Sequence, residues 1–164
     1  MECEDYESIV YKHDFWREDM ENTLNIVKKY IQHKKLILVG GMAIDIALRS
    51  KGKKLYKDNK LPDYDFYSPE HHKDAYDLGL ILAELYDGVS VINAFHVSTM
   101  RVRVNFQEAA DISYIPKNII NRLPTMTHMG FVIIHPHYQM IDQHRSLSMP
   151  FENPPFETVF ARWK

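Results

Sequence analysis

Two aspartates separated by one residue, Asp63 and Asp65, are the first side chains in this sequence that could do chemistry. Alternate residues of a strand share a face, so both carboxylates would point to one side while Tyr64 and Phe66 point into the core. Adjacent carboxylates repel each other unless a cation lies between them, and oxygen ligands suit Mg²⁺ or Mn²⁺ bound together with a triphosphate. A solvated pair in the loop before Ser68 is the alternative interpretation.

A third acid, Asp111, lies within the apolar segment 109–115. An unpaired charge inside such a strand is costly, so this carboxylate needs a partner. A neighbouring strand that carries two metal-binding aspartates would supply one. A salt bridge to Arg101 or Arg103 is the alternative.

Gly40 and Gly41 follow the apolar run 36–39 and precede a stretch with helical spacing, residues 42–50. A strand that turns through glycines into a helix exposes backbone N–H groups at the helix N-terminus, where the helix dipole favours a phosphate. Glycine lets the ligand approach the backbone closely. The alternative is a plain tight turn with no ligand.

Hydrophobic spacing and turn residues indicate the elements that must position these side chains. Ser68 is the predicted cap of a helix with Pro69 in its first position. Other helices are predicted over residues 14–32, 42–50 and 116–123, and strands over 36–39, 63–67, 89–93, 100–106, 111–115 and 130–134. The predicted fold is α/β (α+β), with a mixed, mostly antiparallel sheet of about five strands packed against helices and the site on one sheet face.

The length of 164 residues suffices for one domain with a hydrophobic core. We expect an N-terminal helix over 1–35, the main domain over 36–150, and over 151–164 a C-terminal helical segment that has only begun, as in a fragment of a longer chain. The formal net charge of −2 excludes a globally basic nucleic-acid binder, so a polyanion must be met by a local patch or by metal ions.

The single cysteine, Cys3, excludes an internal disulfide framework and fits a reducing compartment. No apolar run reaches the roughly 18 residues of a membrane helix, and the acidic N-terminus is unlike a targeting peptide. We therefore expect a cytoplasmic protein that does not act in a membrane.

Basic residues crowd the segment 49–60, where the only acid is Asp58. Such a patch could meet an RNA backbone, and the alternative is a solvated loop. The basic residues are Arg49, Lys51, Lys53, Lys54, Lys57 and Lys60.

The order of strand, Gly-Gly, helix, Asp-Tyr-Asp and a later acid on a strand resembles the signature of the DNA-polymerase-beta-like nucleotidyltransferase superfamily. Longer strings are similar to the viral poly(A) polymerase catalytic subunits of large nucleocytoplasmic DNA viruses, and the similarity runs from about Leu36 to the end. The strings are residues 38–45, 61–68, 110–118, 141–148, 152–155 and 162–164.

This resemblance implies a nucleotidyltransferase palm that adds adenylate from ATP to RNA 3′ ends without a template. It implies two Mg²⁺ or Mn²⁺ ions, with Asp63 and Asp65 bridging both and Asp111 holding the ion nearest the attacking hydroxyl. It also implies ATP and RNA as partners, a processivity subunit or a second copy of the chain as further ones, and a viral factory or virion as the setting.

The resemblance places Gly40, Gly41 and Met42 against the phosphates of the nucleotide. Many superfamily members have a hydroxyl residue at the position of Met42, so here the phosphate contacts would rest on backbone N–H groups. Members of the viral family are also much longer. Two alternatives therefore stay open: a minimal nucleotidyltransferase that acts on a protein or a small molecule, and a non-catalytic RNA-binding or assembly subunit of the same fold.

Overall fold

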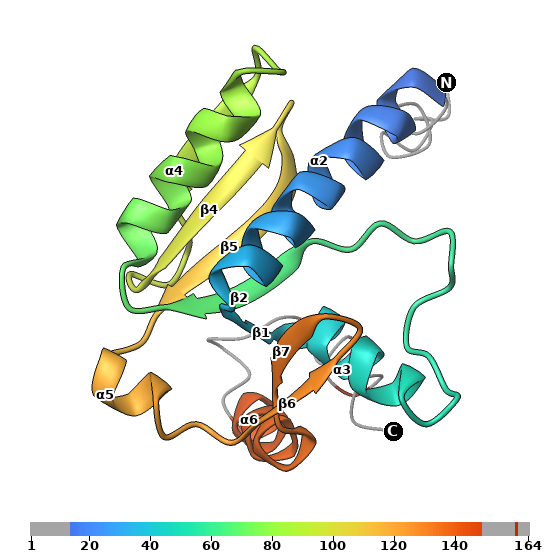
Figure 1. Ribbon diagram of the computed structural model, residues 1–164, viewed down its shortest axis with the longest axis vertical. Helices are drawn as coiled ribbons and strands as arrows, with labels where there is room; N and C mark the ends of the chain where they lie inside the picture. Colours follow the sequence, from blue (N-terminus) through green and yellow to red (C-terminus); the bar gives the residue numbers. More distant parts are fainter. Residues whose placement is uncertain (1–13, 149–159, 161–164) are drawn as a thin grey trace.

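The computed structural model describes residues 14–148 and Phe160 of the chain, with side chains from residue 17 onward (Figure 1). Within these residues it contains seven strands and five helices. They are α2 (Asp14–Lys34), β1 (Ile37–Val39), α3 (Gly40–Arg49), β2 (Tyr64–Ser68), α4 (His71–Ala83), β3 (Val89–Asn93), β4 (Thr99–Val104), β5 (Gln107–Tyr114), α5 (Lys117–Ile120), β6 (Thr125–His128), β7 (Phe131–Ile134) and α6 (Pro136–Ser148).

The strands form one sheet in the order β3-β4-β5-β2-β1-β7-β6. The pairs β2–β5 and β1–β7 are parallel, and the other four pairs are antiparallel. The predicted α/β fold with a mixed, mostly antiparallel sheet is therefore confirmed, although the sheet has seven strands rather than about five. The edge strand β6 escaped prediction because its four residues alternate between exposed and half-buried and give little hydrophobic signal.

The β4–β5 hairpin closes through a tight turn at Asn105 and Phe106, both of which have a positive φ. Phe106 was predicted as the last residue of the strand 100–106. Here the side chain is 91% exposed, since the ring lies at the tip of the turn. As a result β5 begins at Gln107, four residues before the predicted start at Asp111.

Helices α2 and α4 lie side by side and pack on the strands β2, β4 and β5 (Figure 1). The core between them and the sheet contains the side chains that alternate away from the aspartates, and Phe66 and Ile112 are fully buried there. Leu78 and Leu82 of α4 and Val27 and Ile31 of α2 supply the helical side of this core. Burying these apolar surfaces is the main driving force that holds the sheet against the two helices.

The link from β2 to α4 depends on a buried carboxylate, Asp74, which is 3% exposed. It accepts hydrogen bonds from the Tyr30 hydroxyl at 2.8 Å, from the Lys34 ammonium and from the Ser68 hydroxyl. Burial raises the pKa of Asp74, but these three bonds outweigh it, so the pKa lies below its usual range. The group therefore stays ionised and ties α2, β2 and α4 together.

Ser68 ends β2 instead of capping the helix as predicted. Its oxygen accepts a hydrogen bond from the Glu70 N–H at 2.9 Å, and α4 begins one residue later at His71. The serine therefore closes the turn before the helix, while its hydroxyl proton is donated to Asp74.

No helix in the described part of the chain is long and apolar enough to span a membrane. The predicted helical segment over 151–164 lies outside the described residues, with the exception of Phe160.

Candidate metal and nucleotide site

The parallel pairing of β2 with β5 places Asp65 directly opposite Asp111 in the strand register. Asp63 comes one residue before β2, on the same face as Asp65 because side chains alternate along the chain. One carboxylate oxygen from each of the three residues lies within 4.8 Å of the others, and all three side chains are half-buried. The structure thus brings together the three acids that the sequence singled out.

Hydrophobic anchoring on the opposite face explains why the aspartates point outward. Tyr64 is 8% exposed and Phe66 is fully buried, so both pack toward α2 as expected. The Tyr64 ring also stacks on Phe131 of β7, with ring centroids 5.9 Å apart. Turning β2 over would expose these two aromatic side chains and bury two carboxylates, which burial energetics forbids.

The electrostatic environment of Asp63 shows that negative charge is concentrated here. Burial raises the pKa of Asp63, and the nearby carboxylates of Asp111 and Glu108 raise it further, against a smaller opposing effect of Arg101. A divalent cation between the carboxylates would lower the pKa of Asp63 and so oppose the effects of burial, Asp111 and Glu108. The oxygen-only donor set fits Mg²⁺ or Mn²⁺, whereas zinc sites in proteins usually include nitrogen or sulfur ligands.

Arg101 of β4 is the protein's own cation at this site. It lies opposite Asp111 in the register, and its Nε and Nη2 donate to the two Asp111 oxygens at 2.8 and 2.6 Å. It also pairs with Glu108, whereas Arg103 reaches only Glu108, at 3.5 Å. The salt bridge that the sequence offered as an alternative partner for Asp111 therefore coexists with the cluster of three aspartates.

Gly40 stands directly against the metal-ligand candidates. Its φ is +67°, and a Cβ added there would lie 2.2 Å from Oδ2 of Asp65. Only glycine fits both the left-handed backbone and this close approach. Helix α3 begins at this residue, and its N-cap, Val39, makes no side-chain capping bond. The N-terminus of α3 therefore lies beside the aspartates, where the helix dipole favours an anion.

Helix α6 supplies residues near the site that the sequence analysis missed. A recess of about 20 Å³, room for about one water molecule, lies between Gly40 and Tyr67 on one side and Tyr138 and Asp142 of α6 on the other. Burial raises the pKa of Tyr67 to about 12, and Asp142 contributes to the increase. Strand alternation places Tyr67 on the same face of β2 as Asp65.

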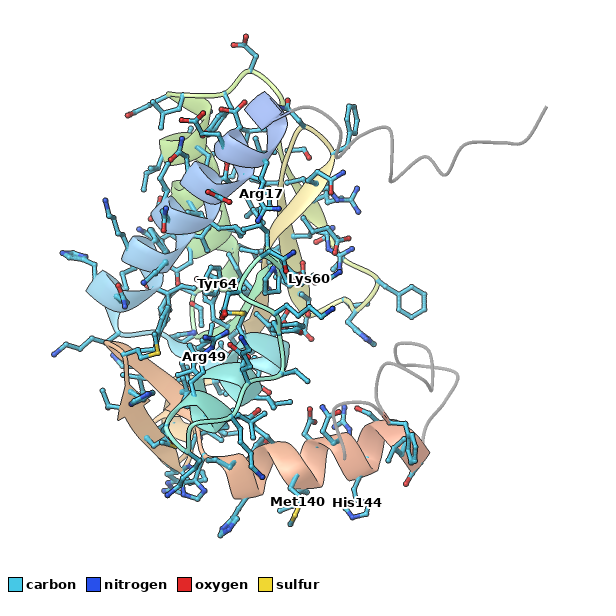
Figure 2. The ribbon with its side chains drawn as sticks, turned by 90° about the vertical axis from the view of Figure 1, so that its right-hand side faces the viewer. Arg17, Arg49, Lys60, Tyr64, Met140 and His144 are labelled. Atoms are coloured by element: carbon cyan, nitrogen blue, oxygen red, sulfur yellow. The ribbon has the colours of Figure 1, made fainter. Side chains whose placement is uncertain are left out.

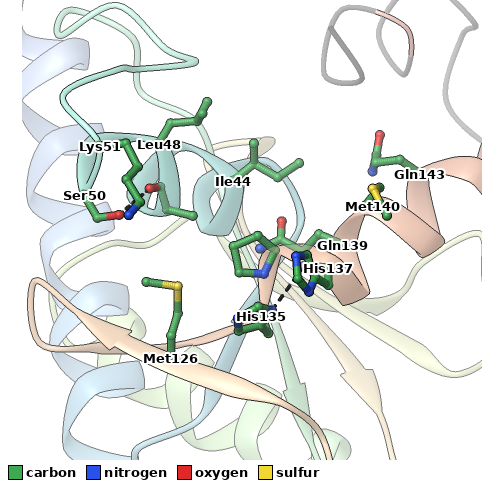
Figure 3. A pocket seen from close by; sticks show the side chains of 12 residues that line it. Ile44, Leu48, Ser50, Lys51, Met126, His135, His137, Gln139, Met140 and Gln143 are labelled. Carbon is green, nitrogen blue, oxygen red and sulfur yellow. Dashed lines mark hydrogen bonds between the residues drawn. The ribbon is translucent and has the colours of Figure 1, made fainter.

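A larger pocket, of about 640 Å³, lies elsewhere, between α3, α6 and the β6–β7 hairpin (Figure 3). Its walls are mainly apolar and none of the three aspartates reaches it. Within it, the His137 N–H donates to Nδ1 of His135 at 3.3 Å (Figure 3). The lining residues are Ile44, Ala47, Leu48, Ser50, Lys51, Met126, His135, Pro136, His137, Gln139, Met140 and Gln143.

Comparisons with known proteins agree on one family. The family model for the poly(A) polymerase catalytic subunit matches residues 25–153. A protein of African swine fever virus, provisionally named a poly(A) polymerase catalytic subunit, is 46% identical over 160 residues, which cover 97% of this chain and 34% of that protein. A mimivirus protein with the same provisional name is 29% identical over 144 residues, 86% of this chain and 24% of the relative.

Among solved structures, the crystal structure of the Megavirus polyadenylate synthase is similar with a TM-score of 0.83 and 25% sequence identity. The match covers 95% of this chain and 32% of that one. This chain therefore spans about a third of the length of the African swine fever virus relative and of the Megavirus protein.

Proposed function

Because this chain belongs to the poly(A) polymerase catalytic subunit family, we propose that it transfers adenylate from ATP to RNA 3′ ends without a template. The observation that supports this most directly is the meeting of Asp63, Asp65 and Asp111 beside the N-terminus of α3. A nucleotidyl transfer site needs both parts, since carboxylates hold the metal ions and N–H groups meet the phosphates.

Two divalent cations would supply activation of the attacking hydroxyl and neutralisation of the triphosphate charge. We propose that Asp63 and Asp65 hold both ions and that Asp111 holds the one nearer the RNA hydroxyl. The raised pKa of Asp63 and the oxygen-only donors of the cluster fit this assignment.

The protein's own groups would then orient the reaction. The backbone N–H groups of Gly40, Gly41 and Met42 bind the phosphates of ATP at the uncapped end of α3. The RNA 3′ hydroxyl loses its proton to solvent, its oxygen forms a bond to the α-phosphorus of ATP, and the bond from that phosphorus to pyrophosphate breaks so that pyrophosphate leaves. Arg101 orients Asp111 through its two hydrogen bonds.

We also propose that RNA is the acceptor and that the protein works in the cytoplasm, in a viral factory or a virion. The viral relatives and the single cysteine support this setting. A further proposed partner is a processivity subunit or a second copy of the chain.

The test is a titration of ATP into the purified chain with Mn²⁺, alongside a gel assay for extension of a short labelled RNA. Metal-dependent ATP binding with extension is the expected result. The double variant Asp63→Asn with Asp65→Asn should lose more than the roughly 100-fold in metal affinity that removing an outer-shell partner costs. Asp77→Asn, on α4, is the matched control and should bind as the unchanged chain does.

Each other outcome points to a different function. Binding without extension would favour a different acceptor, a protein or a small molecule. Unchanged metal-dependent ATP binding in the double variant would show that Asp63 and Asp65 do not hold the metal ions. RNA binding without any metal-dependent ATP binding would favour a non-catalytic RNA-binding subunit.

A further inference from the structure

The connection from α3 to β2 contains a run of exposed basic side chains. We call residues 51–60 the lysine loop, because five of its ten residues are lysines and its only acid is Asp58. The chain as a whole has a formal net charge of −2, whereas this loop is a local region of positive charge.

The shape of the lysine loop is set by residues other than its lysines. Asp45 of α3 is 2% exposed and accepts hydrogen bonds from the N–H groups of Leu55 and Tyr56, at 2.7 and 2.9 Å. Arg49 donates to the same carboxylate at 2.5 Å. At the other end of the loop, Arg17 of α2 donates to the Asn59 carbonyl at 2.8 Å. These bonds hold the loop in one conformation.

Internal pairing leaves most of the loop's positive charge unused. Asp58 forms ion pairs with Lys54 at 2.6 Å and with Arg49 at 3.2 Å, so its charge is already shared. The other four lysines are exposed, and within the described part of the chain none of them forms an ion pair. They are Lys51, Lys53, Lys57 and Lys60.

The loop leads directly into the candidate metal site. Two residues, Leu61 and Pro62, separate Lys60 from Asp63, a span of at most about 11 Å along an extended chain. Figure 2 places Lys60 on the side of Tyr64 away from α2, which is the side to which Asp63 and Asp65 belong by strand alternation. A polyanion whose end lies at the aspartates would therefore pass the ammonium groups of Lys60 and Lys57.

We propose that the lysine loop binds the phosphates of the RNA strand immediately upstream of its 3′ end. This inference rests on the proposed function, since it takes RNA as the acceptor. The aspartates repel an incoming RNA backbone, and the exposed ammonium groups of Lys57 and Lys60 offset that repulsion on the approach to the site. Because the loop is held by Asp45 and Arg17, the lysines are presented to the strand with little further ordering of the backbone.

The experiment measures RNA affinity of the full chain by fluorescence anisotropy with a short labelled single-stranded RNA, at several salt concentrations. Each phosphate neutralised contributes about −0.7 to the slope of log affinity against log salt. The variant Lys57→Gln with Lys60→Gln should reduce the steepness of that slope by about 1.4. Between about 50 and 200 mM salt, the unchanged chain would then lose about sevenfold more affinity than the variant.

The matched control is Lys29→Gln with Lys73→Gln, two exposed lysines on α2 and α4. It removes the same charge from the helices that cover the other sheet face, so it should leave the slope unchanged. Metal-dependent ATP binding, measured in parallel, should be the same in both double variants.

An unchanged slope in the loop variant, or an equal reduction in the control, would overturn the inference. Metal-dependent ATP binding without any RNA binding would also overturn it while leaving the nucleotide site intact. Lysine-dependent binding that is tighter to phosphatidylserine vesicles than to RNA would identify a membrane surface instead. Loss of ATP binding with retained, lysine-dependent RNA binding would contradict the proposed function and not the loop's role.

Discussion

Replacing Gly40 by alanine should weaken metal binding at the aspartate cluster, because the new methyl group would occupy the place of a ligand. The added Cβ would lie 2.2 Å from Oδ2 of Asp65 and 3.0 Å from its Cγ. Ordinary van der Waals contact begins at about 3.4 Å, so the oxygen must withdraw by about 1.2 Å. Metal–ligand distances tolerate only about 0.2 Å, so Asp65 could no longer hold an ion together with Asp63 and Asp111.

Two effects of this substitution can be separated by magnitude. A left-handed backbone at φ +67° costs alanine about 1–2 kcal/mol, which should lower the melting temperature by about 2–8 °C in a chain of this size. Displacement of Asp65 should lower the affinity for Mn²⁺ in the presence of ATP by about 10–100-fold. Calorimetric titration measures the second effect and thermal unfolding the first.

Gly52 provides the control because its φ is +73° and an added Cβ would meet nothing within 4 Å. Gly52→Ala should therefore lower the melting temperature by a similar amount and leave Mn²⁺ affinity unchanged. The reasoning fails if Gly40→Ala binds Mn²⁺ as tightly as the unchanged chain, or if Gly52→Ala loses as much affinity.

Two further predictions concern charges. Arg101→Met should destabilise the metal-free chain by about 1–3 kcal/mol, because it leaves Asp111 without its cation in a partly exposed pair. Added Mn²⁺ should then raise the melting temperature of the variant more than that of the unchanged chain. Equal melting curves for the two chains would contradict this prediction. The depressed pKa of Asp74 means that its contribution to stability is fully present above about pH 4, the unfolded value, and is lost as the pH falls through the folded value. Asp74→Asn should flatten the decrease of unfolding free energy below about pH 4, as urea titrations at several pH values would show.

The parts of the site that depend on local periodicity were predictable from the sequence. The alternation of Asp63 and Asp65 with Tyr64 and Phe66 is a property of one strand, and the structure has it as expected. The turn at Gly40 was predictable for the same reason, because an apolar run, two glycines and a helical pattern follow one another directly.

Features that depend on contacts between distant segments were not predictable in the same way. The sequence indicated that Asp111 needs a partner, but it could not decide between the other two aspartates and Arg101. The structure places Asp111 beside Asp63 and Asp65 and also pairs it with Arg101. Tyr138 and Asp142 were missed because their approach to Gly40 depends on how α6 packs after the β6–β7 hairpin. No periodicity within a single segment contains that information.

The pairing of β2 with β5 also makes metal binding sensitive to how the two strands are aligned. Asp65 and Asp111 are 46 residues apart in sequence, yet they face each other across neighbouring strands. Sliding β5 by one residue would turn Asp111 to the opposite face and set Ala110 or Ile112 in its place. An ion that binds only the native alignment stabilises it by about 2.7 kcal/mol at one hundred times its dissociation constant. We therefore expect a divalent metal ion to stabilise the native alignment of β2 and β5 during folding, before any nucleotide binds.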